Sequence, residues 1–322
     1  MASDAGRRVV LGSFALIALC FAVGAALVVV AAAIAESRGS LAGDAVGPLE
    51  LGIAGGAVTI ALAFLLLPLL ARFTRPGDDL RLLELCDPGQ PLLRDLMERA
   101  GGTYNHSIMT GALVEAAARS IGANALLARV GAYYHDIGKL ERPQFFVENQ
   151  SGIRNPHDAA APAQSAFIIT AHVRDGVARA EKAGLPRAVI EIIAQHHGTS
   201  LVTYFYRKAS AGGVAVDEGP FRYEGEPPSS REAALVMLAD AAEASVRGLA
   251  DAGPVQIEAA IRRVVATKSA DGQLVASGMS DEDIEAAVVA YAKMLAGLRH
   301  ARVEYPDDAE GDADAGHSQL QP

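Results

Sequence analysis

A series of metal-binding residue types runs through the middle of this chain in the order His, His-Asp, His, His-His, Asp. The seven residues are His106, His135, Asp136, His172, His196, His197 and Asp240. Five of the chain's eight histidines fall in this series. A fold that uses the whole series must bring these side chains to one place from separate segments. This requirement constrains the architecture more than any other feature of the sequence.

The residue types in the series indicate the kind of metal and the chemistry. Imidazole and carboxylate ligands without a thiolate suit Mn, Fe, Co or Zn, and the two cysteines, Cys20 and Cys86, form no thiolate motif. Seven side chains are too many for one four-coordinate metal and about right for two metals that share a carboxylate. Two metals roughly 3.5–4 Å apart contact both the attacking and the leaving oxygen of a phosphoryl displacement. The series therefore predicts a metal-dependent phosphohydrolase.

Two long apolar stretches lie near the start of the chain, at about residues 9–34 and 51–70, and neither contains a charge. Each is long enough to cross a hydrocarbon core of about 30 Å as a helix, so we predict two transmembrane helices. One alternative is a pair of buried helices in a large core. Another is a cleaved signal peptide, because Arg7 and Arg8 precede the first stretch and a small-residue motif ends it.

The arginines around these stretches predict their orientation. Arg7 and Arg8 precede the first stretch, and Arg72 and Arg75 follow the second. The connecting loop contains a single positive residue, Arg38. Because positive residues collect on the cytoplasmic side, we expect a multi-pass protein of the inner membrane whose remaining domain lies in the cytoplasm. Small-residue runs in both stretches leave homo-oligomers open.

Composition divides the chain into three parts. Residues 1–76 read as the membrane anchor, residues 77–304 as an almost entirely helical domain, and residues 305–322 as an acidic, disordered tail. The net charge is −10 and no basic run occurs. An acidic chain of this kind is a poor binder of nucleic-acid polymers, although a local cationic site can still bind a small phosphorylated ligand.

Helix signals are frequent in the central part, and they predict an all-α bundle. Ser229 and Glu232 have the spacing of a capping box before a helix at residues 233–249. Ser280 begins the last long helix, whereas residues 209–228 read as a loop. The ligands are therefore expected to converge from different helices.

Two pairs of adjacent ligands stand just before glycines. His135 and Asp136 are followed by Gly138, and the pair 196–197 is followed by Gly198. Adjacent residues in a regular helix diverge by about 100°, so both members of a pair reach one site most readily at a helix end. A carboxylate has two oxygens and can bridge two metals, whereas an imidazole binds one.

Several longer blocks resemble the HD superfamily of metal-dependent phosphohydrolases. The closer resemblance is to the HD domain of the PgpH-type seven-transmembrane HD proteins, which are cyclic-di-AMP phosphodiesterases. The resemblance covers roughly residues 80–300 and rests on 102–109 (GTYNHSIM), 131–139 (GAYYHDIGK), 142–150 (RPQFFVENQ), 155–158 (NPHD), 195–199 (QHHGT) and 238–240 (LAD). It implies an HD-domain helical bundle with a binuclear metal site, preceded here by two transmembrane helices.

The resemblance also implies a role for each ligand. One metal is expected on His106, His135, Asp136 and Asp240, and the other on Asp136, His172, His196 and His197, with Asp136 as the catalytic bridge. We expect two divalent metal ions, Mn or Fe, and a metal-bridging hydroxide that attacks phosphorus.

Three further residues are candidates for binding the substrate. Lys139 and Arg142 follow the His-Asp pair and are expected to hold phosphate oxygens and developing charge. The alternative for both is a solvated cationic face. Tyr223, in the long loop, is a candidate for contacting a base or a phosphate. His157 is interpreted either as part of the local structure or as a residue that contacts a ligand without binding metal.

Two departures from the family pattern refine the prediction. We expect two spans in place of the family's seven, without the extracytoplasmic region that normally precedes them. No Gly-Tyr-Pro follows the adjacent histidines, as it does in the cyclic-di-GMP branch; residues 201–206 (LVTYFY) follow instead. We therefore expect a membrane-anchored phosphodiesterase that converts cyclic di-AMP to 5′-pApA. The alternatives are an HD phosphohydrolase of another nucleotide, or a metal-binding regulator that responds to nucleotides without turnover.

Overall fold

The computed structural model describes residues 76–150, 154–211, 215–249 and 252–300, with a few isolated positions elsewhere. The predicted spans at 9–34 and 51–70 lie outside these residues except at isolated positions, and so does the predicted tail at 305–322. Among the helices that are described, none combines the length and the apolar character needed to cross a bilayer. The chain divides into two compact units, Met1–Glu84 and Leu85–Pro322.

The described residues are helical, as the sequence predicted. Five short 3₁₀ helices accompany the α-helices, and an isolated bridge between Leu201 and Arg222 is the only strand-like pairing in this part of the chain. The α-helices are α3 (Pro76–Leu85), α4 (Pro91–Arg99), α5 (Gly101–Ser120), α6 (Ala125–Tyr134), α7 (Pro162–Lys182), α8 (Arg187–Gln195), α9 (Thr203–Ala209), α10 (Arg231–Arg247), α11 (Pro254–Ala270) and α12 (Asp281–His300). The 3₁₀ helices are η1 (Ile137–Glu141), η2 (Pro143–Phe145), η3 (Val147–Asn149), η4 (Pro156–Asp158) and η5 (Gly219–Phe221).

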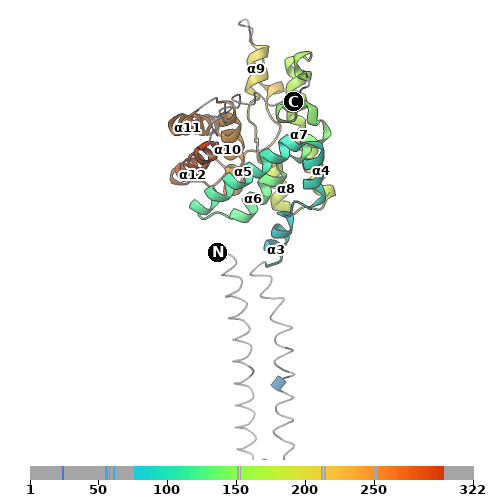
Figure 1. Cartoon of the computed structure of the whole chain (residues 1–322), viewed down its shortest axis with the longest axis vertical. Coiled ribbons are helices and arrows are strands. Elements are labelled where there is room, and N and C mark those ends of the chain that lie inside the picture. The colour runs from blue at the N-terminus through green and yellow to red at the C-terminus, as the bar shows by residue number, and fades with distance from the viewer. Residues whose placement is uncertain are drawn as a thin grey trace, which may run out of the picture. The chain divides into compact units, whose positions relative to one another are not determined.

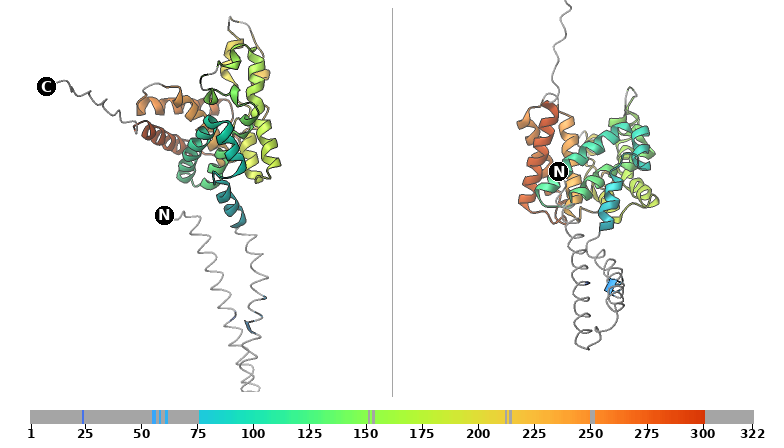
Figure 2. Two further views of the ribbon diagram at one scale, coloured as in Figure 1. Left: turned by 45° about the vertical axis from the view of Figure 1, so that its right-hand side comes forward. Right: turned by 60° about the horizontal axis from the view of Figure 1, so that its bottom comes forward.

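Helices α5, α6 and α10 form the centre of the domain. Helices α11 and α12, orange to red in Figures 1 and 2, lie on one side of α5, and α7 to α9 lie on the other. The core between them includes Leu113 of α5, Leu235 and Leu238 of α10, and Tyr291 of α12. Residues 233–239 of α10 are all buried, which is expected of a helix that is apolar on every face.

The N-cap of α10 differs from the predicted one by one residue. Ser230, not Ser229, is the N-cap, and its hydroxyl accepts a hydrogen bond from the backbone N–H of Ala233 at 3.2 Å. Glu232 accepts a hydrogen bond from the backbone N–H of Asn124 instead of completing a capping box. The predicted box was therefore wrong, because a contact with another element satisfies the glutamate.

Ser229 has a different partner, which lies next to the ligands. Its backbone N–H and hydroxyl both donate to Oε1 of Gln195, at 3.0 and 3.1 Å. Gln195 ends α8 immediately before His196. The residue before the α10 cap therefore ties that loop to the turn that carries the adjacent histidines.

Helix α6 ends at Tyr134, and the chain then passes very close to α7. A Cβ on Gly138 would lie 1.9 Å from the carbonyl oxygen of His172 and 2.5 Å from the backbone N of Gly176. Only glycine permits this approach, because both contacted atoms belong to the backbone of a helix. The approach brings Asp136, two residues earlier, against the helix that carries His172.

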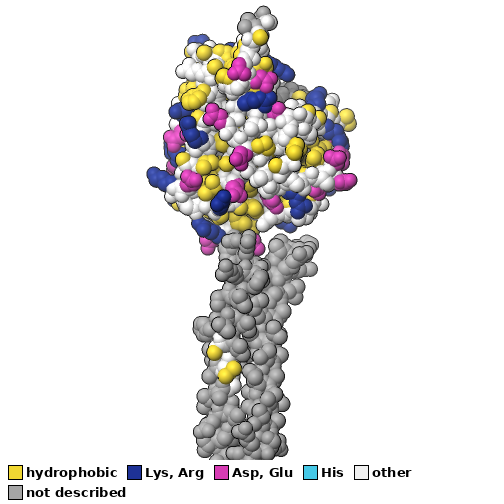
Figure 3. All heavy atoms as spheres, turned by 180° about the vertical axis from the view of Figure 1, so that it is seen from behind, with side chains coloured by type: hydrophobic (Ala, Val, Ile, Leu, Met, Phe, Trp, Pro, Cys, Tyr) yellow, Lys and Arg dark blue, Asp and Glu magenta, His cyan; other side chains and the backbone are white. Residues whose placement is uncertain are grey.

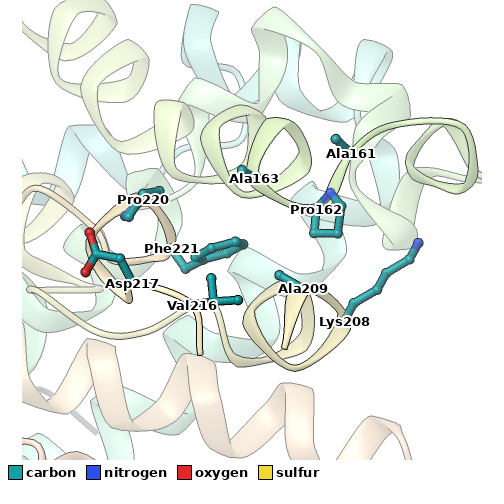
Figure 4. Close-up of a pocket in the computed structure, with 9 residues that line it drawn as sticks. All are labelled: Ala161, Pro162, Ala163, Lys208, Ala209, Val216, Asp217, Pro220 and Phe221. Atoms are coloured by element: carbon teal, nitrogen blue, oxygen red, sulfur yellow. The ribbon is translucent and has the colours of Figure 1, made fainter. Parts of the chain in front are cut away.

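An apolar hollow lies beside the start of α7 and the end of α9 (Figure 4). Its lining includes Pro162, Lys208 and Phe221, and Phe221 also belongs to a small buried cluster with Phe205. None of the predicted site residues lines it. The hollow is therefore separate from the predicted chemistry.

Basic and acidic side chains are interspersed on the face of the domain shown in Figure 3. Lys and Arg side chains form no continuous stripe across the described part of this face. The expectation that the chain binds no nucleic-acid polymer stays a prediction.

We expect Gly138→Ala to lower the free energy of unfolding by about 3 kcal/mol, because the new methyl group must displace the backbone of α7. Gly297→Ala in α12 is the control, since no atom lies within 4 Å of its Cβ position and alanine is the better helix former. Thermal unfolding of both variants tests this prediction. Equal melting temperatures would contradict it.

Candidate metal centre

The seven predicted ligands come from five elements and converge on one buried place. They are His106 of α5, His135 and Asp136 at the end of α6, His172 of α7, His196 and His197 after α8, and Asp240 of α10. Ligand atoms of His106, His135 and Asp136 lie within 4.8 Å of one another, and so do those of His172, His196 and His197. The first group falls within the ligand set predicted for one metal, and the second within the set predicted for the other.

Asp136 lies between the two groups. Its Oδ2 atom is 3.1 Å from Nε2 of His135 and 3.8 Å from Nε2 of His106. Its Oδ1 atom is 3.3 Å from Nε2 of His172 and 3.8 Å from Nε2 of His196. One oxygen therefore faces each group, which is the geometry that a bridging carboxylate needs.

Asp240 closes the cluster from α10. Its Oδ1 atom is 3.0 Å from Nε2 of His106 and 4.0 Å from Nε2 of His135. Its Oδ2 atom is 3.7 Å from Nδ1 of His197. The carboxylate therefore lies nearest to the first group and also approaches His197 of the second.

Three of the histidines are oriented by their own helices. In each, Nδ1 donates to the backbone carbonyl three residues earlier, so Nε2 points into the cluster. The pairs are His135 with Ala132 at 2.7 Å, His172 with Ile169 at 2.6 Å, and His196 with Ile193 at 2.7 Å. A hydrogen bond of this kind on the far nitrogen fixes the tautomer and direction of a metal-binding imidazole.

His106 is oriented by a carboxylate instead. Its Nδ1 atom lies 2.9 Å from Oε2 of Glu243, while Nε2 faces Asp240. Glu243 stands three residues after Asp240 on α10, so both carboxylates lie on the same face of the helix. The sequence analysis did not identify Glu243, although this spacing was the signal that could have revealed it.

Burial keeps three imidazoles in the neutral form that binds metals. It lowers the pKa of His172 and of His197, and it lowers the pKa of His196 to about 3, with the neighbouring imidazoles acting in the same direction. His106 behaves in the opposite way. Burial alone would lower its pKa, but the hydrogen bonds with Asp240 and Glu243 raise it to about 10.

Both carboxylates are held in the charged form. Burial alone would raise the pKa of Asp136, but the charges of His135 and Lys139 hold it well below the usual range. Burial would also raise the pKa of Asp240, and the hydrogen bond with His106 outweighs it. The cluster therefore combines carboxylates with mostly neutral imidazoles, which is the protonation state that ligands require.

Unsatisfied polar atoms support a metal in the cluster. Nε2 of His135 and Oδ1 of Asp136 are buried and have no hydrogen-bond partner among the described residues. Buried polar groups without partners are costly, and metal coordination would satisfy both atoms. The nitrogen and oxygen donors suit Mn or Fe. The residues present therefore fit a divalent metal site.

The two predicted cations occupy different positions. Nζ of Lys139 lies 2.7 Å from Oδ2 of Asp136 and 2.7 Å from Oε1 of Glu148, so the structure brings it into the site. Arg142 is exposed, and its guanidinium makes no hydrogen bond or ion pair with any described residue. The structure does not bring Arg142 into contact with the ligands.

The two remaining residues, Tyr223 and His157, differ in their position relative to the cluster. The Tyr223 ring stacks on the imidazole of His197, with centroids 4.2 Å apart and planes at 28°. His157 packs against the rings of Phe145 and Phe205, and its Nε2 contacts the carbonyl of Phe145 at 3.0 Å. Tyr223 therefore borders the cluster, whereas His157 lies outside it.

The cluster opens to solvent on one side. The side chains of His197 and Asp240 are 20% and 15% exposed, whereas those of the other five ligands are at most 3% exposed. Tyr223 stands at this opening. The solvent-accessible side of the cluster is therefore the side of His197 and Asp240.

We expect Glu243→Gln to weaken metal binding about 10- to 100-fold, because it removes the carboxylate that orients His106. Metal retained after dialysis against graded concentrations of chelator measures the effect. Glu191→Gln, an exposed change on α8, is the control. Equal retention in the two variants would contradict the orienting role.

Comparison with known proteins agrees with this geometry. The HD domain family model matches residues 103–245. The chain is 40% identical over 282 residues to the cyclic-di-AMP phosphodiesterase PgpH of Bacillus subtilis (strain 168), covering 87% of this chain and 40% of that protein. It is 41% identical over 230 residues to PgpH of Listeria monocytogenes serotype 1/2a (strain 10403S), covering 71% and 32%. The chain thus spans less than half the length of these relatives.

Solved structures match the described domain. The crystal structure of the L. monocytogenes PgpH HD domain is 40% identical, with a TM-score of 0.63, and the match covers 66% of this chain and all of that one. The same domain in complex with cyclic-di-AMP matches with a TM-score of 0.64, covering 66% of this chain and 99% of that one. The chain therefore belongs to the HD-domain family, alongside the PgpH proteins, as its motifs predicted.

Proposed function

We propose that this chain is a metal-dependent phosphodiesterase that hydrolyses cyclic di-AMP to 5′-pApA. The observation that carries the proposal is the pair of ligand groups joined by Asp136. This arrangement lies on the same fold as a relative that was solved in complex with cyclic-di-AMP. The named PgpH relatives support the reaction and the substrate.

Two divalent metals fit the ligand set. His106, His135, Asp136 and Asp240 would hold one, and Asp136, His172, His196 and His197 the other. When bound, such a pair supplies the nucleophile by lowering the pKa of a water and stabilises charge on phosphate oxygens. In this proposal the nucleophile would be a hydroxide shared by the two metals.

The chain's own residues prepare this site. The helix carbonyls and Glu243 orient the imidazoles, and burial of five ligands keeps bulk water away from all but one side. Nζ of Lys139 binds the Asp136 carboxylate and Glu148 together, so it fixes the direction of the bridge. Lys139 is close enough to Asp136 to contact a substrate phosphate held beside that carboxylate. The exposed Arg142 is a candidate for binding a phosphate at the surface.

We also propose that residues 1–76 anchor the domain to the inner membrane, with the HD domain in the cytoplasm. Two uncharged stretches and the distribution of arginines support this proposal.

A product assay tests the function. The full chain with Mn²⁺ is incubated with cyclic di-AMP or cyclic di-GMP, and products are identified by chromatography and mass. We expect pApA from cyclic di-AMP. Metal-loaded protein that leaves both intact would favour another nucleotide substrate or a regulator without turnover.

We expect Asp136→Ala to lose both metals and all turnover, because it removes the group shared by the two ligand sets. Metal content by mass spectrometry and the product assay measure the two effects separately. A variant that keeps the second metal would contradict the bridging role.

We expect Arg142→Ala to raise KM for cyclic di-AMP about tenfold, the effect of losing one charge-assisted hydrogen bond, while both metals stay bound. Arg187→Ala removes an exposed arginine of α8 and serves as the control. Loss of metal from the Arg142 variant would show a structural role instead.

A further inference from the structure

One cation beside the opening has not been assigned a role. Lys268 lies near the end of α11, beyond residues 103–245 that the HD family model matches. Its side chain is partly buried, and its spacing from the buried Ile261 and Val265 places it on the same, inward face of α11. The family pattern and the motifs of the sequence give no reason for it.

The Lys268 ammonium is held against the segment that follows the adjacent histidines. Its Nζ donates to Oγ of the buried Ser200 at 2.7 Å. The backbone N–H of Ser200 donates to the carbonyl of His197 at 3.0 Å, and that of Tyr223 donates to the carbonyl of Ser200 at 3.1 Å. Lys268 is thus connected through one residue to both groups that border the opening.

A second set of contacts makes this segment rigid. The backbone N–H of Thr199 donates to Oε1 of Gln273 at 3.0 Å, and Nε2 of Gln273 donates to the Thr199 hydroxyl at 2.8 Å. Arg222 donates to the Thr199 carbonyl at 3.0 Å and also pairs with Asp271. The residues that follow α11 therefore fix the turn that contains Ser200, the residue to which the Lys268 ammonium donates.

Lys268 has no carboxylate within ion-pair distance among the described residues. Burial lowers its pKa, and the more distant charges of Asp240 and Asp271 oppose this shift only in part. Lys139 differs, because two carboxylates at 2.7 Å neutralise it. A partly buried cation without an ion pair is costly, so Lys268 is the cation best placed to gain from an incoming anion.

The charge of Lys268 acts at the opening of the cluster. Ser200, which accepts the hydrogen bond from the ammonium, is bonded through its backbone to His197 and to Tyr223. His197 and Asp240 are the two exposed ligands. The ammonium makes no hydrogen bond or ion pair with any of the seven candidate ligands in the described part of the chain.

A cyclic dinucleotide carries two phosphodiesters, and one binuclear centre engages one of them at a time. We propose that Lys268 binds the phosphodiester that is not being cleaved, with Ser200 holding its ammonium in place. This assignment rests on the proposed function. It makes α11 part of the substrate site and explains why a lysine is positioned there without an ion pair.

The test compares Lys268→Gln with Lys268→Arg in the full, Mn²⁺-loaded chain. The substrates are cyclic di-AMP and bis(p-nitrophenyl) phosphate, which has a single phosphodiester. We expect Lys268→Gln to raise KM for cyclic di-AMP about tenfold with kcat and metal content almost unchanged. KM for the single phosphodiester should not change, and Lys268→Arg should recover most of the loss.

Arg263→Gln is the matched control, because it removes one exposed positive charge from the same helix. The assignment is overturned if Lys268→Gln behaves like this control, if it loses metal, or if it affects both substrates equally. A wild-type chain that cleaves bis(p-nitrophenyl) phosphate but not cyclic di-AMP would contradict the proposed function, and the assignment with it. An unchanged KM in Lys268→Gln with an active wild type would contradict the assignment alone.

Discussion

The buried carboxylate of Asp136 is the interaction on which the rest of the site depends. A carboxylate with 1% of its side chain exposed is stable only where positive or metal partners surround it. Its two oxygens face separate groups of imidazoles, and Lys139 binds it from a third side. This position exists because Gly138 lets η1 approach the backbone of α7. The missing Cβ of Gly138 therefore allows the Asp136 carboxylate, at the end of α6, to lie against the imidazole of His172 on α7.

The ligands could be predicted from the sequence because their chemistry is visible in it. Histidine and aspartate without cysteine restrict the metals, and adjacent pairs next to Gly138 and Gly198 indicate helix ends, where both side chains can reach one site. The structure places both pairs at such ends. The all-α architecture was predictable for a similar reason, since local helix signals extend through the whole central part.

Other parts of the site depend on contacts between distant elements, and no local pattern reveals these. Glu243 meets His106 only because α10 crosses α5, and Ser229 binds Gln195 instead of capping α10. Sequence proximity to the His-Asp pair pointed to Lys139 and Arg142 equally. The structure separates them, because Lys139 turns into the cluster between two carboxylates and Arg142 stays exposed. Lys268 is far from the motifs in sequence and lies beside them in the fold.

The central claim is that Asp136 joins two metals, and the positions of bound metals test it most directly. Anomalous scattering from crystals of the Mn²⁺-loaded protein would locate them. We expect two peaks roughly 3.5–4 Å apart, one on each side of the Asp136 carboxylate, with His106 beside one and His172 beside the other. A single peak, or a second peak that Asp136 does not touch, would contradict it.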